Sequence, residues 1–265
     1  MMVDELLTFK QTRDALAGGV SAVDIAKRTL DAIKRDNGVV NAFVALDEKR
    51  ALIDAEHVDA LIAAGVAPGP LAGMPIAVKD IIDVAGLPTK AGSPTRADAA
   101  PAAADAPVVA RLRAAGAIIV GKTHTVEYAF GGWGSNETTG APLNPRDRGH
   151  PRTPGGSSSG SGVAVAAGLV PAALGSDTGG SVRLPASFCG CVGLKTTIGL
   201  VETAGVVPLA SMFDTIGPLT NNVADAALML AVMAPAQDRR SPGWSDRLAA
   251  IAQGAAGQAE GLRVA

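Results

Sequence analysis

Two clusters of glycine and serine hold the residues most capable of chemistry in this chain. The first is GGSS at residues 155–158, and the second is DTGGS at residues 177–181. Apolar runs at residues 163–169 and 170–174 lie between them, which is typical of folded structure and not of a flexible linker. A serine hydroxyl becomes a nucleophile when a nearby base takes its proton. The clusters therefore predict an active site with a serine nucleophile.

The first cluster also matches a motif that requires histidine. Residues 156–160, GSSSG, fit G-x-S-x-G, the nucleophile elbow of α/β-hydrolases, in which an acidic residue and then a histidine follow the serine along the chain. No histidine follows His150, so a Ser-His-Asp triad in that order is excluded. His57, His124 and His150 are interpreted as surface or loop residues.

With histidine excluded, a lysine is the candidate base. A lysine accepts a proton only when neutral, and burial among apolar neighbours lowers its pKa from about 10.4 toward working pH. Lys79 ends the apolar segment GMPIAVK at residues 73–79, which is predicted to be a short strand. On this segment alone an alternative stays open, in which the Lys79 amino group reaches solvent at the strand end.

Residues 116–123 satisfy a third pattern, the phosphate-loop expression G-x-x-x-x-G-K-[ST]. That loop needs flexible residues between its glycines so that backbone N–H groups can surround a phosphate. Here the four intervening residues, AIIV, are themselves a predicted strand. A helix, a turn and a strand are the better interpretation, with Lys122 in the loop that follows the strand.

The elements that would position these residues are two helices followed by alternating strands and helices. Apolar residues recur at helical spacing over residues 6–35 and 48–64, which predicts two amphipathic helices. Residues 106–115 are predicted to form a helix, and residues 117–120 a buried strand. This alternation favours an α/β fold with a mixed or parallel sheet and helices on its faces.

The composition is that of a globular protein. The 265 residues are 48% hydrophobic, and 23 basic against 25 acidic residues leave a net charge of −2 without a basic block, so direct binding to nucleic acid or to a membrane surface is not expected. Residues 1–5 lack the features of an export signal, and no apolar run approaches about 18 residues, so we expect a cytoplasmic protein. Cys189 and Cys191 are too close for an unstrained disulfide and lack partners for a zinc site, so no metal or other cofactor is expected.

The run from GGSSSGSG at residue 155 to GSDTGGSVRLPASFCGCVGLK ending at residue 195 resembles the signature of the amidase signature family. Other segments similar to the family follow its order: PIAVKDIIDVAGLPTKAGS, GAIIVGKTHTVEYAFGG, LNPRD and FDTIGPLTNNVADAALML. The resemblance implies one α/β domain over residues 1–265, with a mixed sheet core flanked by helices. Its N-terminal helical segment would reach about residue 66, and the catalytic core would occupy about residues 67–265.

The resemblance also implies a Ser-Ser-Lys triad that cleaves or transfers carboxamides through an acyl-enzyme. By motif position Lys79 is the terminal base, Ser157 the bridging serine after a cis peptide bond, and Ser181 the nucleophile. The expected oxyanion hole consists of backbone N–H groups at Thr178, Gly179 and Gly180. The expected wall of the acyl pocket is Phe130, Gly131 and Gly132. The remaining roles expected are loop support by Asp177 and Arg183. Ser158, Ser159 and Ser161 are expected to cap and start the helix predicted at residues 163–167 and not to react.

Three functions follow from the resemblance. The first is an amidase acting on a small-molecule amide, the second is the A subunit of a glutamine-dependent tRNA amidotransferase, and the third is an inactive remnant. Leu184 stands where the tRNA-linked proteins are expected to have glutamine, which disfavours the second. Family members are generally much longer, so we expect the C-terminal part of the domain, from a strand near residues 261–265, to be absent. An exposed sheet edge would favour pairing with another chain, as in a homodimer.

Overall fold

A six-stranded mixed sheet forms the centre of the protein. The structure, a computed structural model, describes residues 8–147, 149–234 and 250, so the predicted strand near residues 261–265 and the segment 1–5 lie outside the described residues. The strand order is β1-β3-β2-β4-β6-β5. The strands are β1 (Phe43–Leu46), β2 (Pro75–Lys79), β3 (Ile118–Thr123), β4 (Ala172–Asp177), β5 (Val192–Gly193) and β6 (Thr215–Thr220). β2 is parallel to its neighbours β3 and β4, whereas β1, β5 and β6 pair antiparallel, which confirms the predicted mixed α/β fold.

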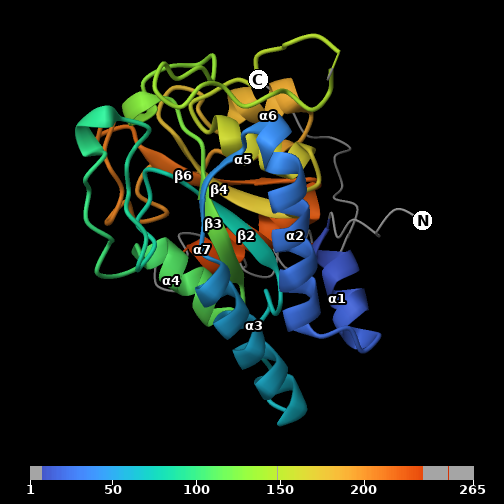
Figure 1. The fold of residues 1–265 in the computed structure, drawn as a ribbon. Helices are drawn as coiled ribbons and strands as arrows, with labels where there is room; N and C mark the ends of the chain where they lie inside the picture. The colour runs from blue at the N-terminus through green and yellow to red at the C-terminus, as the bar shows by residue number, and fades with distance from the viewer. Residues whose placement is uncertain (1–7, 148, 235–249, 251–265) are drawn as a thin grey trace, which may run out of the picture.

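Helices cover both faces of this sheet (Figure 1). They are α1 (Phe9–Ala17), α2 (Ala22–Val40), α3 (Glu48–Ala63), α4 (Pro107–Ala114), α5 (Ser159–Ala166), α6 (Arg183–Cys189) and α7 (Val223–Met233), with short 3-10 turns at Pro94–Arg96 and Glu127–Ala129. Side chains alternate between the faces of a strand. Ala77 of β2 therefore packs in the core shared with α2, α3, α5 and α6, while Ile76 and Val78 pack in the core shared with α4 and α7.

The N-terminal region differs from the prediction in two places. The single helix predicted over residues 6–35 is wrong, because α1 ends at Ala17 and α2 begins at Ala22. Gly19 between them has φ of 90°, a conformation that favours glycine, and the Ser21 hydroxyl then caps α2 by accepting from the Asp24 N–H at 2.9 Å. The strand β1, which pairs with β3, was also not predicted from the sequence. We propose that the segments before and after residue 66 form one domain, since β1 places the first segment in the sheet.

Lys122 lies inside β3 and is fully buried, so the predicted loop position is wrong. β3 continues through this residue because β1 and β2 pair with it on both sides. The Lys122 amino group lies 2.9 Å from the Asp80 carboxylate and donates to the Thr89 hydroxyl at 3.1 Å. Burial raises the pKa of Asp80 and lowers the pKa of Lys122, so the ionised form of each depends on the other.

We expect Lys122→Met to lower the free energy of unfolding by about 3–5 kcal/mol, because the buried Asp80 carboxylate loses its charged partner. Urea unfolding at neutral pH, followed by circular dichroism, measures the change. The control Lys10→Met removes an exposed cation that pairs with Asp14, and it should leave the unfolding midpoint unchanged. A Lys122→Met variant as stable as this control would contradict the importance of the buried pair.

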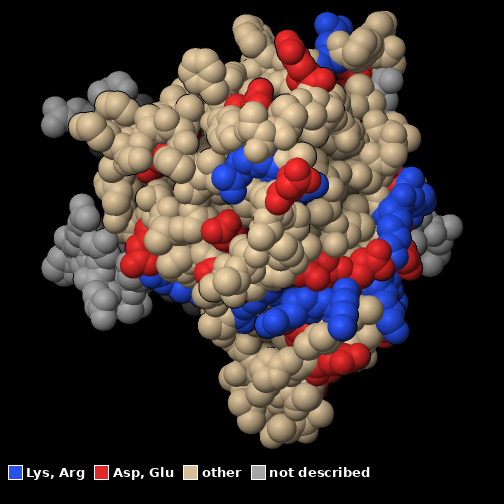
Figure 2. All heavy atoms as spheres, turned by 60° about the vertical axis from the view of Figure 1, so that its left-hand side comes forward, with Lys and Arg blue, Asp and Glu red and all other residues tan. Residues whose placement is uncertain are grey.

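Charges of both signs are mixed on the surface. In Figure 2, acidic and basic side chains lie next to one another, and wide areas carry neither. Lys34, for example, pairs with Glu48, and both side chains are exposed. The expectation that the chain does not bind nucleic acid directly stays a prediction. Among the described residues, no helix combines the length and the apolar character needed to cross a membrane.

Candidate active site

Lys79 lies at the end of β2 with its side chain fully buried. It follows Ala77 on the sheet face that packs against α2 and α5. Its Nζ atom is 2.7 Å from the Ser157 hydroxyl oxygen and 2.8 Å from the Ser176 hydroxyl oxygen. The amino group therefore contacts two serines in the interior and does not reach solvent, which removes the alternative left open by the sequence.

The environment of Lys79 favours a neutral amine. Burial lowers the pKa of Lys79 from its usual value to about 7, although the carboxylates of Asp177 and Asp214 oppose this change. Asp177 is the last residue of β4, and Asp214 is the residue before β6. An amine with such a pKa is neutral in a large fraction of molecules near pH 7 and can accept a proton.

Ser157 is held in the first glycine-serine cluster by an unusual backbone. The peptide bond between Gly156 and Ser157 is cis. A side chain at Gly156 would meet the Gly134 nitrogen at 2.8 Å, so the position has room for glycine alone. The Ser157 carbonyl accepts a hydrogen bond from the Val126 N–H at 3.2 Å, which ties the cluster to the segment after β3. These contacts fix the Ser157 hydroxyl beside Lys79.

Hydrogen bonds between Ser158 and Ser176 join the first cluster to β4, the strand that leads into the second cluster. The Ser158 hydroxyl donates to the Ser176 carbonyl and accepts from the Ser176 N–H, both at 3.2 Å. Ser158 is the N-cap residue of α5, and Ser159 and Ser161 lie in its first turn, so these serines start the helix as predicted, four residues earlier than expected. The Ser158 side chain bonds to β4 and makes no capping hydrogen bond. The Ser158 N–H donates to the Ser181 carbonyl at 3.2 Å, so the loop that carries Ser181 lies against the first cluster.

Ser181 has its backbone next to Ser158, but its hydroxyl is not joined to Ser157 by a hydrogen bond among the described residues. The side chain is largely buried, with 8% of its surface exposed. The structure therefore brings Lys79 and Ser157 into contact and places Ser181 nearby.

Asp177 organises the glycine loop in front of Ser181. Its carboxylate accepts from the Gly180 N–H at 2.8 Å, the Val182 N–H at 3.1 Å and the Arg183 guanidinium at 2.9 and 3.0 Å. Burial opposes ionisation of Asp177, but these hydrogen bonds keep its pKa below the usual value. The Gly180 N–H already donates to Asp177. Among the described residues, three backbone N–H groups of this loop make no hydrogen bond, those of Thr178, Gly179 and Ser181.

The predicted wall of the acyl pocket is partly next to this loop. The Gly132 carbonyl accepts from the Gly156 N–H at 2.8 Å, and a carbon added at Gly132 would lie 3.2 Å from Leu184. A carbon added at Gly180 would also meet Leu184. The structure therefore places Gly132 and Leu184 beside the glycine loop that carries Ser181. The Phe130 residue is 80% exposed, and Gly131, with φ of 157°, connects it to Gly132.

His124 lies in the loop directly after β3, as one of the two predicted alternatives has it, and it is buried there. Its ring nitrogens lie 3.2 Å from the Ser159 hydroxyl and 2.8 Å from the Thr139 hydroxyl. Burial lowers the pKa of His124 to about 4, so the ring is neutral at pH 7. His57 and His150 are exposed, as predicted.

The cysteine thiols are free, and Cys189 is buried while Cys191 is partly buried. Burial raises the pKa of both thiols to about 12, so they are uncharged and unreactive at pH 7. Over residues 8–147, 149–234 and 250, no group of three or more His, Cys, Asp or Glu side chains is arranged to hold a metal ion.

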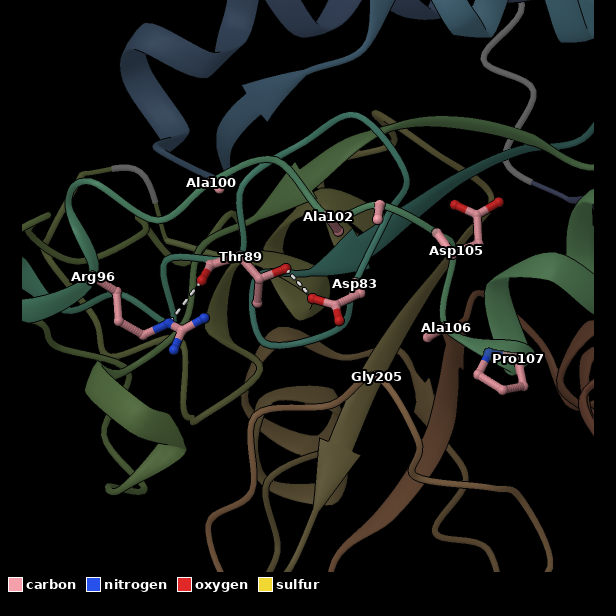
Figure 3. A pocket seen from close by; sticks show the side chains of 11 residues that line it. Asp83, Thr89, Arg96, Ala100, Ala102, Asp105, Ala106, Pro107 and Gly205 are labelled. Carbon is pink, nitrogen blue, oxygen red and sulfur yellow. Dashed lines mark hydrogen bonds between the residues drawn. The ribbon is translucent and has the colours of Figure 1, made fainter.

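A cavity of about 420 Å³ lies away from the predicted catalytic residues, between the loop after β2 and the segment that leads into α4 (Figure 3). Its polar groups bond mainly to one another. Asp83 accepts from the Thr89 hydroxyl at 2.6 Å, and the Thr89 carbonyl accepts from Arg96 at 2.9 Å. Asp105 accepts from the Ala85 N–H at 2.8 Å. This cavity contains no member of the predicted triad.

Ser176, whose hydroxyl is the second one in contact with the Lys79 amino group, was not predicted from the sequence. β4 is parallel to β2, so the carboxyl ends of the two strands meet at the same edge of the sheet. A polar residue at the end of the apolar run 170–174 was the available signal, but the sequence does not tell which strand lies next to Lys79. Asp214, whose charge acts on Lys79, was missed for the same reason.

Comparisons with known proteins agree with this fold. A sequence model of the family described as Amidase matches residues 24–265. The chain is 48% identical over 214 residues to the A subunit of glutamyl-tRNA(Gln) amidotransferase from Gloeobacter violaceus, a match that covers 81% of this chain and 43% of the relative. The protein of the same name from Salinibacter ruber is 45% identical over 263 residues, covering 98% of this chain and 50% of the relative.

Two solved structures illustrate the structural similarity. A chain from a vestigial protein complex that reveals the evolutionary origins of an s-triazine catabolic enzyme has a TM-score of 0.84 and 41% identity, covering 89% of this chain and 51% of that one. The native peptide amidase from Stenotrophomonas maltophilia has a TM-score of 0.80 and 36% identity, covering 92% of this chain and 50% of that one. The chain thus spans about half the length of these relatives.

Proposed function

Because this chain belongs to the amidase family, we propose that its intact protein cleaves the C–N bond of a carboxamide through an acyl-enzyme on Ser181. The observation that carries the proposal is the contact between the Lys79 amino group and the Ser157 hydroxyl. The amine is fully buried, its pKa is about 7, and the serine lies 2.7 Å away in the cluster that also contacts the Ser181 loop. This arrangement supports Lys79 as base and Ser157 as relay for Ser181.

The proposed reaction begins with two proton transfers. Neutral Lys79 takes the proton of Ser157, and Ser157 takes the proton of Ser181, whose oxygen then attacks the amide carbonyl carbon. The carbonyl oxygen becomes an oxyanion, and the C–N bond breaks as the leaving nitrogen receives a proton from Lys79 through Ser157. Water then attacks the acyl-enzyme by the same route and releases the acid.

We propose that the oxyanion is bound by N–H groups of the glycine loop. The candidates are Thr178, Gly179 and Ser181, since the Gly180 N–H already donates to Asp177. A preorganised donor of this kind contributes about 3–4 kcal/mol to transition-state stabilisation. This assignment replaces Gly180 by Ser181 in the set expected from the resemblance.

The acylation rate should depend on pH through Lys79. The base must be neutral, and its pKa is lowered to about 7, so the rate should rise with pH to a plateau with a midpoint near 7. Below the midpoint the rate should fall about tenfold for each pH unit. Labelling of Ser181 by a fluorophosphonate, followed by intact-protein mass spectrometry from about pH 5 to about pH 9, measures this profile. A rate that stays constant across this range would contradict a lysine base.

Leu184 bears on the substrate. It lies beside Gly132 and Gly180 and presents an apolar side chain next to the loop that carries Ser181, so a polar substrate group at this position would gain no hydrogen bond from that side chain. We therefore place an amidase for small carboxamides first. The A subunit of a glutamine-dependent tRNA amidotransferase is the second candidate, because similar curated relatives carry the name of that component of glutamyl-tRNA(Gln) amidotransferase.

One experiment separates the two candidates. The protein is incubated with a panel of small carboxamides that includes glutamine, and the acid products are detected by mass spectrometry. Hydrolysis of an apolar amide by the protein alone would support the first candidate. Glutamine hydrolysis that appears only with the partner subunits of a tRNA amidotransferase would support the second. Product formation that is equal with a Ser181→Ala variant would contradict both.

A further inference from the structure

Ser176 is the second hydroxyl in contact with Lys79, and the proposed reaction does not use it. It lies on β4, is 4% exposed, and its Oγ atom is 2.8 Å from the Lys79 Nζ atom. Its backbone N–H and carbonyl are both bonded to the Ser158 hydroxyl. The main chain of Ser176 is therefore fixed, and its hydroxyl is held beside the proposed base.

The inventory of donors and acceptors gives the two serines different tasks. A neutral amine has two N–H donors and one lone pair, whereas an ammonium group has three donors and no lone pair. To take a proton, neutral Lys79 must direct its lone pair at the Ser157 hydroxyl, so Ser157 donates to Nζ. An N–H of the amine then needs an acceptor, and the Ser176 oxygen is within hydrogen-bond distance. Without it, an N–H could turn toward Ser157, and the proton transfer could not begin.

We propose that Ser176 is a positioning residue that accepts a hydrogen bond from Lys79 and thereby aims the lone pair of the neutral amine at Ser157. Its effect on the reaction rests on the proposed function, but the hydrogen bond itself can be tested without turnover. When Lys79 is protonated, both serines accept from it, so Ser176 also stabilises the ammonium form.

The charges around Lys79 are defined, so a change caused by Ser176 can be recognised. The carboxylates of Asp177 and Asp214 act electrostatically on the amino group, and Arg183 pairs with Asp177. On the neighbouring strand β3, Lys122 forms an ion pair with Asp80. The register partner of Lys122 on β2 is Val78, whose side chain packs in the opposite core from that of Ala77. Helix α5, with sequence SGSGVAVA, has no ionisable side chain. Substitution of Ser176 leaves all these charges in place.

The Ser176→Ala variant should change Lys79 in two ways. Loss of an acceptor destabilises the buried ammonium, so the Lys79 titration midpoint should move to lower pH by about one unit. Because the lone pair is no longer directed, the plateau rate of Ser181 labelling by a fluorophosphonate should fall about tenfold to a hundredfold. Ser176→Thr keeps a hydroxyl on a strand residue and should restore both values.

The titration is followed by NMR on protein with selectively ¹³C-labelled lysine, with the Lys79 signal assigned by loss in a Lys79→Arg variant. Ser161→Ala is the matched control, because it removes another buried hydroxyl that bonds to Thr123 and to the Leu174 carbonyl and not to Lys79. A lowered midpoint and plateau in Ser176→Ala, with rescue by threonine and no change in the control, support the proposal.

Three results would overturn it: an unchanged Lys79 titration in Ser176→Ala, an equal shift in the Ser161→Ala control, or an unchanged labelling plateau together with a shifted titration. Wild-type protein that is not labelled at Ser181 would instead count against the proposed function. In that case the NMR titration still decides whether Ser176 bonds to Lys79, and an unchanged midpoint rejects the inference.

Discussion

The Ser181→Ala variant is expected to form no fluorophosphonate adduct and to lose at least about 10⁴-fold in amide hydrolysis, because no other group can form the acyl-enzyme. Intact-protein mass spectrometry detects the adduct, and peptide mapping of the wild-type protein places it on one serine. The size of the effect follows from the role of a nucleophile, since its removal leaves only the contribution of binding and of the oxyanion donors.

The contacts of the other cluster serines explain why the adduct should form at Ser181. Ser157 bonds to Lys79, Ser158 to β4, Ser159 to His124, and Ser161 to Thr123. All four are 0% exposed, whereas Ser181 is 8% exposed and its hydroxyl makes no hydrogen bond among the described residues. Ser181 is therefore the one of these five hydroxyls that is both accessible and unengaged.

The control for this prediction is Ser187→Ala, which removes an exposed serine on α6, six residues after the nucleophile candidate. It should be labelled at the wild-type rate. Persistent labelling of Ser181→Ala at an equal rate, or mapping of the wild-type adduct to Ser157, would contradict the assignment of the nucleophile.

Local periodicity was sufficient for the inner elements of the fold. The predicted strands at 73–79 and 117–120 correspond to β2 and β3, and the predicted helices at 48–64 and 106–115 to α3 and α4. Inner strands of a parallel sheet are buried on both faces, so their apolar runs are continuous and easy to detect. β1 has four residues, only one of them fully buried, and its role comes from pairing with β3, which no local pattern reveals.

The predicted triad, by contrast, came from motif resemblance and not from spacing. Lys79 and Ser157 are 78 positions apart in the chain, and their contact depends on the order of the strands. For the same reason the loop position predicted for Lys122 was wrong, and the burial of His124 was not predicted. Each polar group is satisfied by distant residues, Asp80 and Thr89 for Lys122, and Thr139 and Ser159 for His124. A buried polar side chain is stable when such partners exist, and only the tertiary structure supplies them.

The Lys79→Met variant should lose about 10²- to 10⁴-fold in the plateau rate of Ser181 labelling, which is the usual contribution of a general base. Methionine fills a similar volume and places no charge in the core, so the protein should remain folded. The labelling profile should also lose its midpoint near pH 7, because the group that titrates there is absent. Rates are measured by mass spectrometry, and folding is checked by circular dichroism.

The relay gives this prediction a sharper form. If Lys79 acts only by taking the proton that passes through Ser157, the two residues act as one unit, and Ser157→Ala combined with Lys79→Met should be no slower than the slower single variant. Lys90→Met, which alters an exposed lysine on the loop after β2, should keep both the wild-type rate and the midpoint. Additive losses in the double variant would mean that Lys79 and Ser157 assist Ser181 independently, whereas a wild-type rate in Lys79→Met would show that another group removes the proton.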